Sequence, residues 1–234
     1  MDQSLFNNIE TIFIDLDDTI WDFTANSKIA MRIVYNKYGL QEQCPYEHFE
    51  KVYFSINSEL WEQYHHAQIT KEYLKRERFS RSFRECGIVY EEPEKFDFEY
   101  LETIVQQSNI VPGALELLQH LTLKFKVHVL SNGFSNLQYR KLQSGGLDKY
   151  ITEIVLSDDI NITKPDKRLF DYALSRVNGI AESTLMIGDN YDADILGAIN
   201  AGWRTIYFNR KGINPGPNLA DLTVVNLEDI IPFF

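Results

Sequence analysis

Short apolar runs alternate with amphipathic stretches along the second half of the chain. Runs rich in β-branched residues predict strands at residues 11–15, 126–131, 152–157, 183–188 and 204–208. Amphipathic segments of helix length follow the later runs, at about residues 135–147, 166–178 and 192–201. Strands that alternate with helices are typical of βαβ crossovers. The expected fold class is therefore α/β, with a doubly wound, Rossmann-like parallel sheet.

The segment between the first two predicted strands interrupts this alternation. It spans about 110 residues and contains one helical pattern after another. Phe49, Val52, Tyr53, Ile56 and Leu60, for example, follow the i, i+3, i+4 spacing of an apolar helix stripe. A single crossover needs far fewer residues. We therefore expect a helical insert at residues 20–105 in a catalytic core made of residues 1–19 and 106–234.

Composition and charge narrow the classes of partner. The chain has 234 residues, of which 44% are hydrophobic and 24% charged, as in ordinary globular proteins. A formal net charge of -11 disfavours a nucleic-acid polymer, because binding one depends on cations that neutralise phosphates. Two cysteines, no basic-apolar leader and no apolar run of membrane-spanning length favour a cytoplasmic protein without a membrane partner.

Polar residues gather where the predicted strands end. Ligands of open α/β sheets bind at the carboxyl ends of the strands, so residues there can converge although they are distant in sequence. The residues at or beyond these ends are Asp15 and Asp17 after the first strand, Ser131, Asn132 and Gly133 after the second, Lys164 after the third, and Asp189 and Asp194 after the fourth.

The acidic residues of this set predict a metal site. Asp15 and Asp17 are two positions apart on an extended segment, so their side chains face the same way while Leu16 turns into the core. Carboxylates this close repel one another unless a cation or a shared proton intervenes. Mg²⁺ suits such a pair, and Asp189 is a natural further ligand.

The remaining residues suit a phosphate group beside that metal. Ser131 offers a hydroxyl, and the backbone amides of Asn132 and Gly133 precede a predicted helix. Lys164 supplies a positive charge. A carboxylate such as Asp15 can attack phosphorus, and Asp17 can then act as general acid and base.

Four segments together resemble a known family. DLDDT (15–19), LSNG (130–133), KPD (164–166) and GDNYDAD (188–194) are similar, in order, to the four motifs of the haloacid dehalogenase superfamily of hydrolases. The resemblance implies the following roles: Asp15 is the nucleophile; Asp17 is the acid/base and a Mg²⁺ ligand through its backbone carbonyl; Ser131 and Asn132 hold phosphate; Lys164 balances charge; Asp189 ligates Mg²⁺; and Asp194 supports the metal's water shell.

The resemblance also implies a function and a role for the insert. The insert is similar to the helical cap that covers the site and selects substrates in one large subgroup. In the family, phosphatases have an acidic residue at the position that corresponds to Asp17, whereas dehalogenases of this type lack one. LDDTIWDF (16–23) and AGWRTIYFNRKGINPG (201–216) resemble pyrimidine-type 5′-nucleotidases. We therefore expect a Mg²⁺-dependent phosphomonoester hydrolase whose favoured small phosphorylated substrate is a nucleoside monophosphate.

Two alternative functions stay open at this point. The first is a phosphatase or mutase acting on a sugar or small acid phosphate, because the core motifs address only the phosphoryl group. The second, from another class, is a receiver-type phosphoacceptor, which also combines acidic residues, a Ser or Thr and a Lys around Mg²⁺. Trp21 and Phe23 follow the aspartates directly, and they could stack on a base or pack in the core.

Overall fold

The structure is a computed structural model that describes residues 3–234. It contains two compact units. The first comprises the chain up to Phe23 together with Ser108–Phe234, and the second comprises Thr24–Gln107. The insert was expected at residues 20–105, and its role as a cap stays a prediction.

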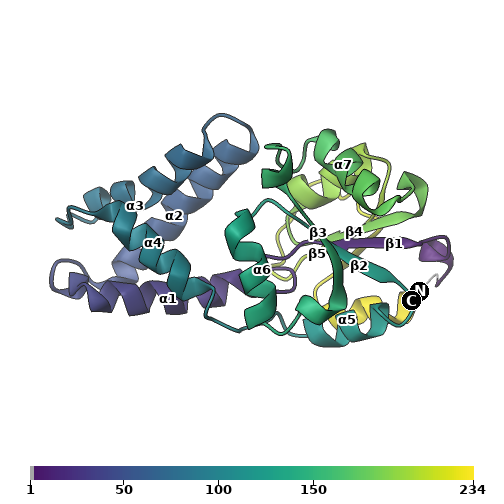
Figure 1. Ribbon diagram of the computed structural model, residues 1–234, viewed down its shortest axis with the longest axis horizontal. Coiled ribbons are helices and arrows are strands. Elements are labelled where there is room, and N and C mark those ends of the chain that lie inside the picture. The colour runs from purple at the N-terminus through teal and green to yellow at the C-terminus, as the bar shows by residue number, and fades with distance from the viewer. Residues whose placement is uncertain (1–2) are drawn as a thin grey trace. The chain divides into compact units, whose positions relative to one another are not determined.

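The first unit is built on a parallel sheet of six strands in the order β3-β2-β1-β4-β5-β6 (Figure 1). The strands are β1 (Thr11–Ile14), β2 (Lys126–Ser131), β3 (Ile151–Leu156), β4 (Thr184–Gly188), β5 (Arg204–Phe208) and β6 (Leu222–Val224). The expected doubly wound α/β fold is confirmed. The bounds of the first five strands lie within one residue of their predicted positions. Strand β6 was not predicted, because three residues are too few to show a pattern.

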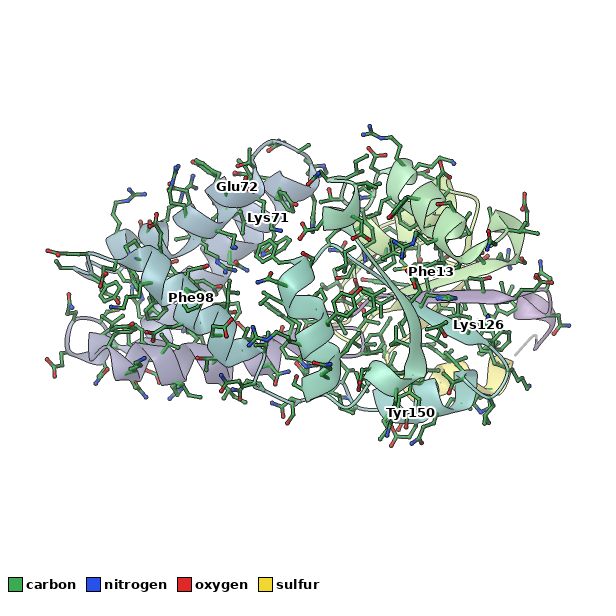
Figure 2. All side chains as sticks on the ribbon, in the orientation of Figure 1. Phe13, Lys71, Glu72, Phe98, Lys126 and Tyr150 are labelled. Atoms are coloured by element: carbon green, nitrogen blue, oxygen red, sulfur yellow. The ribbon has the colours of Figure 1, made fainter. Side chains whose placement is uncertain are left out.

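Helices lie on both faces of this sheet, as Figure 1 shows for α5 (Ala114–Leu121) on one side and α7 (Lys167–Val177) on the other. The core on the α7 face includes Phe13, Met186 and Trp203 with Leu169 and Phe170 of α7. Phe13, labelled in Figure 2, is a fully buried member of this core. Its ring centroid is 5.0 Å from that of Trp203. Burial on both faces explains why the strands read as continuous apolar runs.

The helices of the first unit begin and end close to the predicted positions, with one exception in helix type. The segment predicted as a helix from 135 to 147 forms α6 (Ser135–Ser144), which ends before Gly145 and Gly146. The segment predicted at 192–201 starts as a π-helix, η6 (Tyr191–Leu196), and continues as α8 (Gly197–Asn200). The π-helix begins three residues after the end of β4 and contains Asp194.

The second unit consists of α1 (Phe23–Lys37), which begins at the boundary residue, α2 (Tyr46–His65), α3 (Lys71–Glu85) and α4 (Pro93–Ile104). Lys71 and Glu72 mark the first turn of α3 in Figure 2. Its core is aromatic: the rings of Tyr53 and Phe79, for example, stack at 4.8 Å. Helix α1 was not predicted, because its buried face includes the polar residues Asn26 and Ser27 and therefore shows a weak apolar stripe.

Membrane-spanning helices were not expected. Over residues 3–234, the helices are all too short or too polar to cross a bilayer.

Candidate active site

The carboxyl ends of four adjacent strands carry the predicted site residues. Asp15 directly follows β1, Ser131 is the last residue of β2, Lys164 lies between β3 and α7, and Asp189 directly follows β4. Because β3, β2, β1 and β4 are parallel neighbours, these ends lie along one edge of the sheet.

Lys164 is the central cation of the site. Its side chain is 2% exposed, and its ammonium group donates to Asp15 Oδ1 at 2.7 Å, to Asp194 Oδ1 at 2.6 Å and to the carbonyl of Leu130 at 2.7 Å. All three N–H donors are therefore used. Burial alone would lower the pKa of Lys164, but Asp15 and Asp194 outweigh it and raise that pKa above its usual value. The lysine stays charged and fixes both carboxylates.

Three carboxylates meet around this lysine. Oxygens of Asp15, Asp189 and Asp194 lie within 4.8 Å of one another. Burial, followed by the Asp15 and Asp194 charges, raises the pKa of Asp189 well above its usual range. Burial is also the main cause that raises the pKa of Asp15 to about 7, against the opposing effect of Lys164. Such mutual repulsion is relieved when a cation binds.

Thr19 connects two of these carboxylates. Its side chain is fully buried, and its hydroxyl lies 3.4 Å from Asp15 Oδ2 and 3.4 Å from Asp189 Oδ1. The same hydroxyl accepts a hydrogen bond from the backbone N–H of Asp189 at 3.1 Å. Thr19 was part of a quoted motif but was not predicted as a site residue. It holds the ends of β1 and β4 in register.

The charge balance of the site favours a divalent cation. Lys211 also brings an ammonium group to the site: its Nζ atom lies 3.3 Å from Asp18 Oδ2 and 3.9 Å from Asp189 Oδ2. The acidic side chains are Asp15, Asp17, Asp18, Asp189 and Asp194, and the basic ones are Lys141, Lys164 and Lys211. With all groups counted as ionised, five carboxylates against three ammonium groups leave a formal excess of two negative charges. Clustered carboxylate oxygens with this excess fit a hard ion such as Mg²⁺.

The phosphate-binding residues predicted after β2 already have partners within the protein. Ser131 Oγ accepts from the backbone N–H of Gly133 at 3.1 Å and from Gln138 Nε2 at 2.6 Å. The side-chain amide of Asn132 makes two hydrogen bonds to the backbone of Lys164. It accepts from the Lys164 N–H at 2.8 Å and donates to the Lys164 carbonyl at 3.0 Å. Asn132 thus positions the Lys164 loop, and Ser131 keeps its hydroxyl at the site.

Two residues of α6 complete the site and were missed by the sequence analysis. Lys141 Nζ lies 2.8 Å from both carboxylate oxygens of Asp17, and Gln138 Nε2 donates to Asp17 Oδ2 at 3.0 Å. Both side chains are buried. The two residues are three positions apart and so share one face of α6, but in sequence a Gln and a Lys on an amphipathic helix are typical of its exposed face.

The residues on either side of Asp17 have other partners. Asp18 has a left-handed backbone with φ of 61°, a conformation that non-glycine residues adopt mainly in turns. Asp22 pairs with Arg210 at 3.0 Å. Trp21 is fully buried, and the Lys141 ammonium lies 5.2 Å from its ring centroid and 5.3 Å from that of Phe23. Trp21 therefore packs in the core and supports Lys141.

Two glycines make room for these contacts. A Cβ on Gly188 would lie 2.2 Å from Asp194 Oδ2, and a Cβ on Gly133 would lie 1.9 Å from Gln138 Nε2. Any side chain at 188 would thus displace the carboxylate that Lys164 binds. The glycines of the LSNG and GDNYDAD segments are there for space.

Comparison with known proteins identifies the class to which this fold and site belong. The family model of the haloacid dehalogenase-like hydrolases matches residues 9–202, and the chain belongs to this family. The resemblance noted from the motifs is confirmed.

Individual relatives match over most of the chain. Pyrimidine 5′-nucleotidase YjjG of Escherichia coli is 33% identical over 85% of this chain and 85% of its own. Pyrimidine 5′-nucleotidase PynA of Streptococcus pneumoniae is 31% identical over 85% of this chain and 83% of its own. The crystal structure of the HAD-hydrolase YfnB of Bacillus subtilis, bound to magnesium, superposes with a TM-score of 0.85 at 28% identity, covering 95% of this chain and 96% of that one.

Proposed function

We propose that this protein is a Mg²⁺-dependent phosphomonoester hydrolase that acts through an aspartyl-phosphate on Asp15, with nucleoside monophosphates as substrates. The observation that carries the proposal is the junction of Asp15, Asp189 and Asp194 around the buried Lys164, at the carboxyl edge of the sheet. The acidic cluster can hold a divalent cation, and that cation together with the fixed Lys164 would offset the negative charge that a phosphate ester brings.

The acidic cluster supports the assignment of the metal ligands. Asp15 and Asp189 would hold Mg²⁺ with the backbone carbonyl of Asp17, and Asp194 would orient its water shell. When bound, the ion neutralises charge on the phosphoryl oxygens and on the carboxylates. Lys164 adds a positive charge that is already in place before substrate arrives, because three hydrogen bonds fix it.

In the first step, a carboxylate oxygen of Asp15 attacks the phosphorus atom of the ester. The new O–P bond forms as the bond from phosphorus to the ester oxygen breaks, and Asp17 transfers a proton to the departing alkoxide. The products are a free alcohol and a phosphoryl group on Asp15. Ser131 and the amides after β2 would bind the phosphoryl oxygens.

In the second step, water attacks phosphorus. Asp17, now a carboxylate, takes a proton from the water as the bond between phosphorus and the Asp15 oxygen breaks. Inorganic phosphate leaves, Asp15 is again a carboxylate and Asp17 is again protonated. The net reaction consumes one water molecule per ester.

The preference for nucleoside monophosphates is supported by the names of two relatives, each a pyrimidine 5′-nucleotidase with more than 30% identity to this chain. A panel of pyrimidine and purine monophosphates and of sugar phosphates tests it directly. We expect the highest kcat/KM for a pyrimidine nucleoside monophosphate. A higher kcat/KM for a sugar phosphate would refute the nucleotide assignment while leaving the hydrolase assignment intact.

The chemical mechanism is tested separately. Release of phosphate should require added Mg²⁺, stop with excess chelator and fall to background in Asp15→Asn, whereas Asp189→Asn should raise the Mg²⁺ concentration needed for half-maximal rate. Asp192→Asn is the matched control, since Asp192 is an exposed acid of η6, three residues after Asp189. Full turnover in chelator would sink the proposal. A stable phosphoprotein without turnover would instead indicate a phosphoacceptor.

A further inference from the structure

The second unit, Thr24–Gln107, is called the helical unit below, and it contains another group of potential metal ligands. This group consists of Cys44, His48 and Cys86, whose ligand atoms all lie within 4.8 Å of one another. Cys44 precedes α2, His48 is in the first turn of α2, and Cys86 directly follows α3. We propose that these three side chains form a site for one Zn²⁺ ion.

The ligand chemistry selects the metal. Two sulfurs and an imidazole are soft or intermediate donors, which bind Zn²⁺ well and Mg²⁺ poorly. In a tetrahedral site, Zn–S bonds of about 2.3 Å place two sulfurs about 3.8 Å apart, so the three ligand atoms need only small side-chain movements. A water molecule would complete the coordination.

The backbone around the ligands is held in place. The Tyr35 hydroxyl donates to the Cys44 carbonyl at 2.7 Å, and the Cys86 N–H donates to the Ser82 carbonyl at 3.0 Å. The side-chain amide of Gln43 joins the two loops: it accepts from the Val89 N–H at 2.8 Å and donates to the Val89 carbonyl at 3.4 Å. These hydrogen bonds therefore fix the backbone on which the two cysteines approach each other.

Accessibility and charge also suit a metal. Cys44 is buried, Cys86 is partly buried and His48 is exposed, so an ion can enter from the His48 side. Zn²⁺ binding would displace the thiol protons, so the ion would be bound by two thiolates and one neutral imidazole.

The ion would cross-link segments that lie 42 positions apart, at residues 44 and 86. The loop so closed contains α2 and α3, whose aromatic side chains form much of the core of the helical unit. A ligand that binds only the folded state stabilises it by mass action. The proposed role is therefore structural and independent of hydrolysis.

The test uses the full chain under reducing conditions. Co²⁺ is titrated as a spectroscopic substitute for Zn²⁺, because a thiolate-to-metal charge-transfer band reports sulfur ligation and is silent for a carboxylate site. We expect one sulfur-ligated ion per chain, displaced by Zn²⁺ but not by Mg²⁺. His48→Ala and Cys86→Ser should weaken binding at least about tenfold.

Two controls separate this site from other sources of metal binding. His66→Ala removes another exposed histidine of the same unit and should leave the band unchanged, as should Asp189→Asn in the acidic cluster. Excess Zn²⁺ should raise the melting temperature of the wild-type chain by about 5 °C, and should not raise that of Cys86→Ser.

The proposal is overturned if the wild-type chain gives no charge-transfer band, or if Cys86→Ser binds Co²⁺ with the affinity and band intensity of the wild type. Formation of a Cys44–Cys86 disulfide in oxidant, without metal binding in reductant, would also overturn it. None of these outcomes depends on phosphate release, so the zinc site and the proposed hydrolase activity can fail separately.

Discussion

Lys141 Nζ lies 2.8 Å from both carboxylate oxygens of Asp17, although the two residues are 124 positions apart. The lysine is 3% exposed, and the rings of Trp21 and Phe23 lie beneath its ammonium group. The two catalytic aspartates proposed for the first motif therefore have separate cations: Lys164 for Asp15 and Lys141 for Asp17. Lys141 acts here as a positioning residue.

Replacing Lys141 should impair the use of Asp17 more than the binding of substrate. In Lys141→Met, the apolar stem is kept and the ammonium group is lost, so Asp17 is no longer held at its observed position. We expect kcat to fall about 100-fold with a small change in KM, as for a misplaced catalytic group. Steady-state kinetics measure both constants. Lys149→Met, at an exposed lysine of the same unit, should match the wild type, and an unchanged kcat in Lys141→Met would remove the positioning role.

A methyl group at position 188 should disrupt the contact between Lys164 and Asp194. The added Cβ of Gly188→Ala would lie 2.2 Å from Asp194 Oδ2 and 2.6 Å from Asp194 Cβ, so the whole side chain must move. We expect at least a 100-fold loss of activity and a destabilisation of about 2 kcal/mol, measured by urea unfolding.

Gly146→Ala is the matched comparison for this change. Its added Cβ meets open space, but the backbone φ of 66° is unfavourable for alanine. It should cost about 1 kcal/mol of stability and leave activity unaltered. Equal activities for the two variants would show that position 188 is not spatially restricted.

The helical unit contains a buried ion pair whose loss should be costly. Arg78 and Asp97 have side chains 3% and 9% exposed, and Arg78 Nε donates to Asp97 Oδ1 at 2.5 Å. Asp97→Ala leaves the guanidinium buried without its counter-ion, so we expect a destabilisation of about 3–5 kcal/mol in chemical denaturation. Lys37→Ala breaks a mainly exposed pair with Glu99 and should cost less than about 1 kcal/mol. Similar costs for both would contradict this account.

Stability should fall on acidification because of His128. Burial, with a smaller contribution from Lys126, lowers the pKa of His128 from 6.5 to about 4. His128 is 4% exposed, and its ring packs on that of Phe13. The residue opposite it in the register of β3 is Glu153. Below pH 6.5 the unfolded chain binds a proton that the folded chain refuses, so this stability is present above pH 6.5 and is lost as the pH falls towards 4.

The comparison of wild type with His128→Leu isolates this effect. Between pH 7 and pH 5, the wild type should lose about 2 kcal/mol more unfolding free energy than the variant. Urea unfolding at each pH provides the values, and His66→Leu, at an exposed histidine, should follow the wild type. Parallel pH curves for wild type and His128→Leu would disprove the assignment.

The amino-acid pattern alone was sufficient to predict the parallel sheet and the site residues at the ends of its strands. Strands buried on both faces must be apolar along their whole length, which made the first five visible as runs of β-branched residues. Parallel strands present their carboxyl ends at one edge, so the order of the motifs was enough to predict that Asp15, Ser131, Lys164 and Asp189 would come together. This inference needed no knowledge of side-chain geometry.

Packing between elements decided what the pattern could not express. Helix α1 buries Asn26 and Ser27, and the Ser27 hydroxyl lies 2.7 Å from that of Tyr100. A polar residue that is buried beside a hydrogen-bond partner cannot be told from a solvent-exposed polar residue by sequence alone. The same ambiguity concealed Gln138 and Lys141, which look like exposed positions of an amphipathic helix.

The assignment of each cation to an aspartate likewise required the folded chain. From the sequence, Lys164 was expected to balance the charge of the whole acidic group. In the structure its three N–H donors are all used by Asp15, Asp194 and the Leu130 carbonyl. Asp17 is bound instead from α6. Motif and spacing determined which chemistry meets at the sheet edge; the placement of α6 against it decided which side chain holds which, because such contacts depend on distances across the fold and leave no period in the sequence.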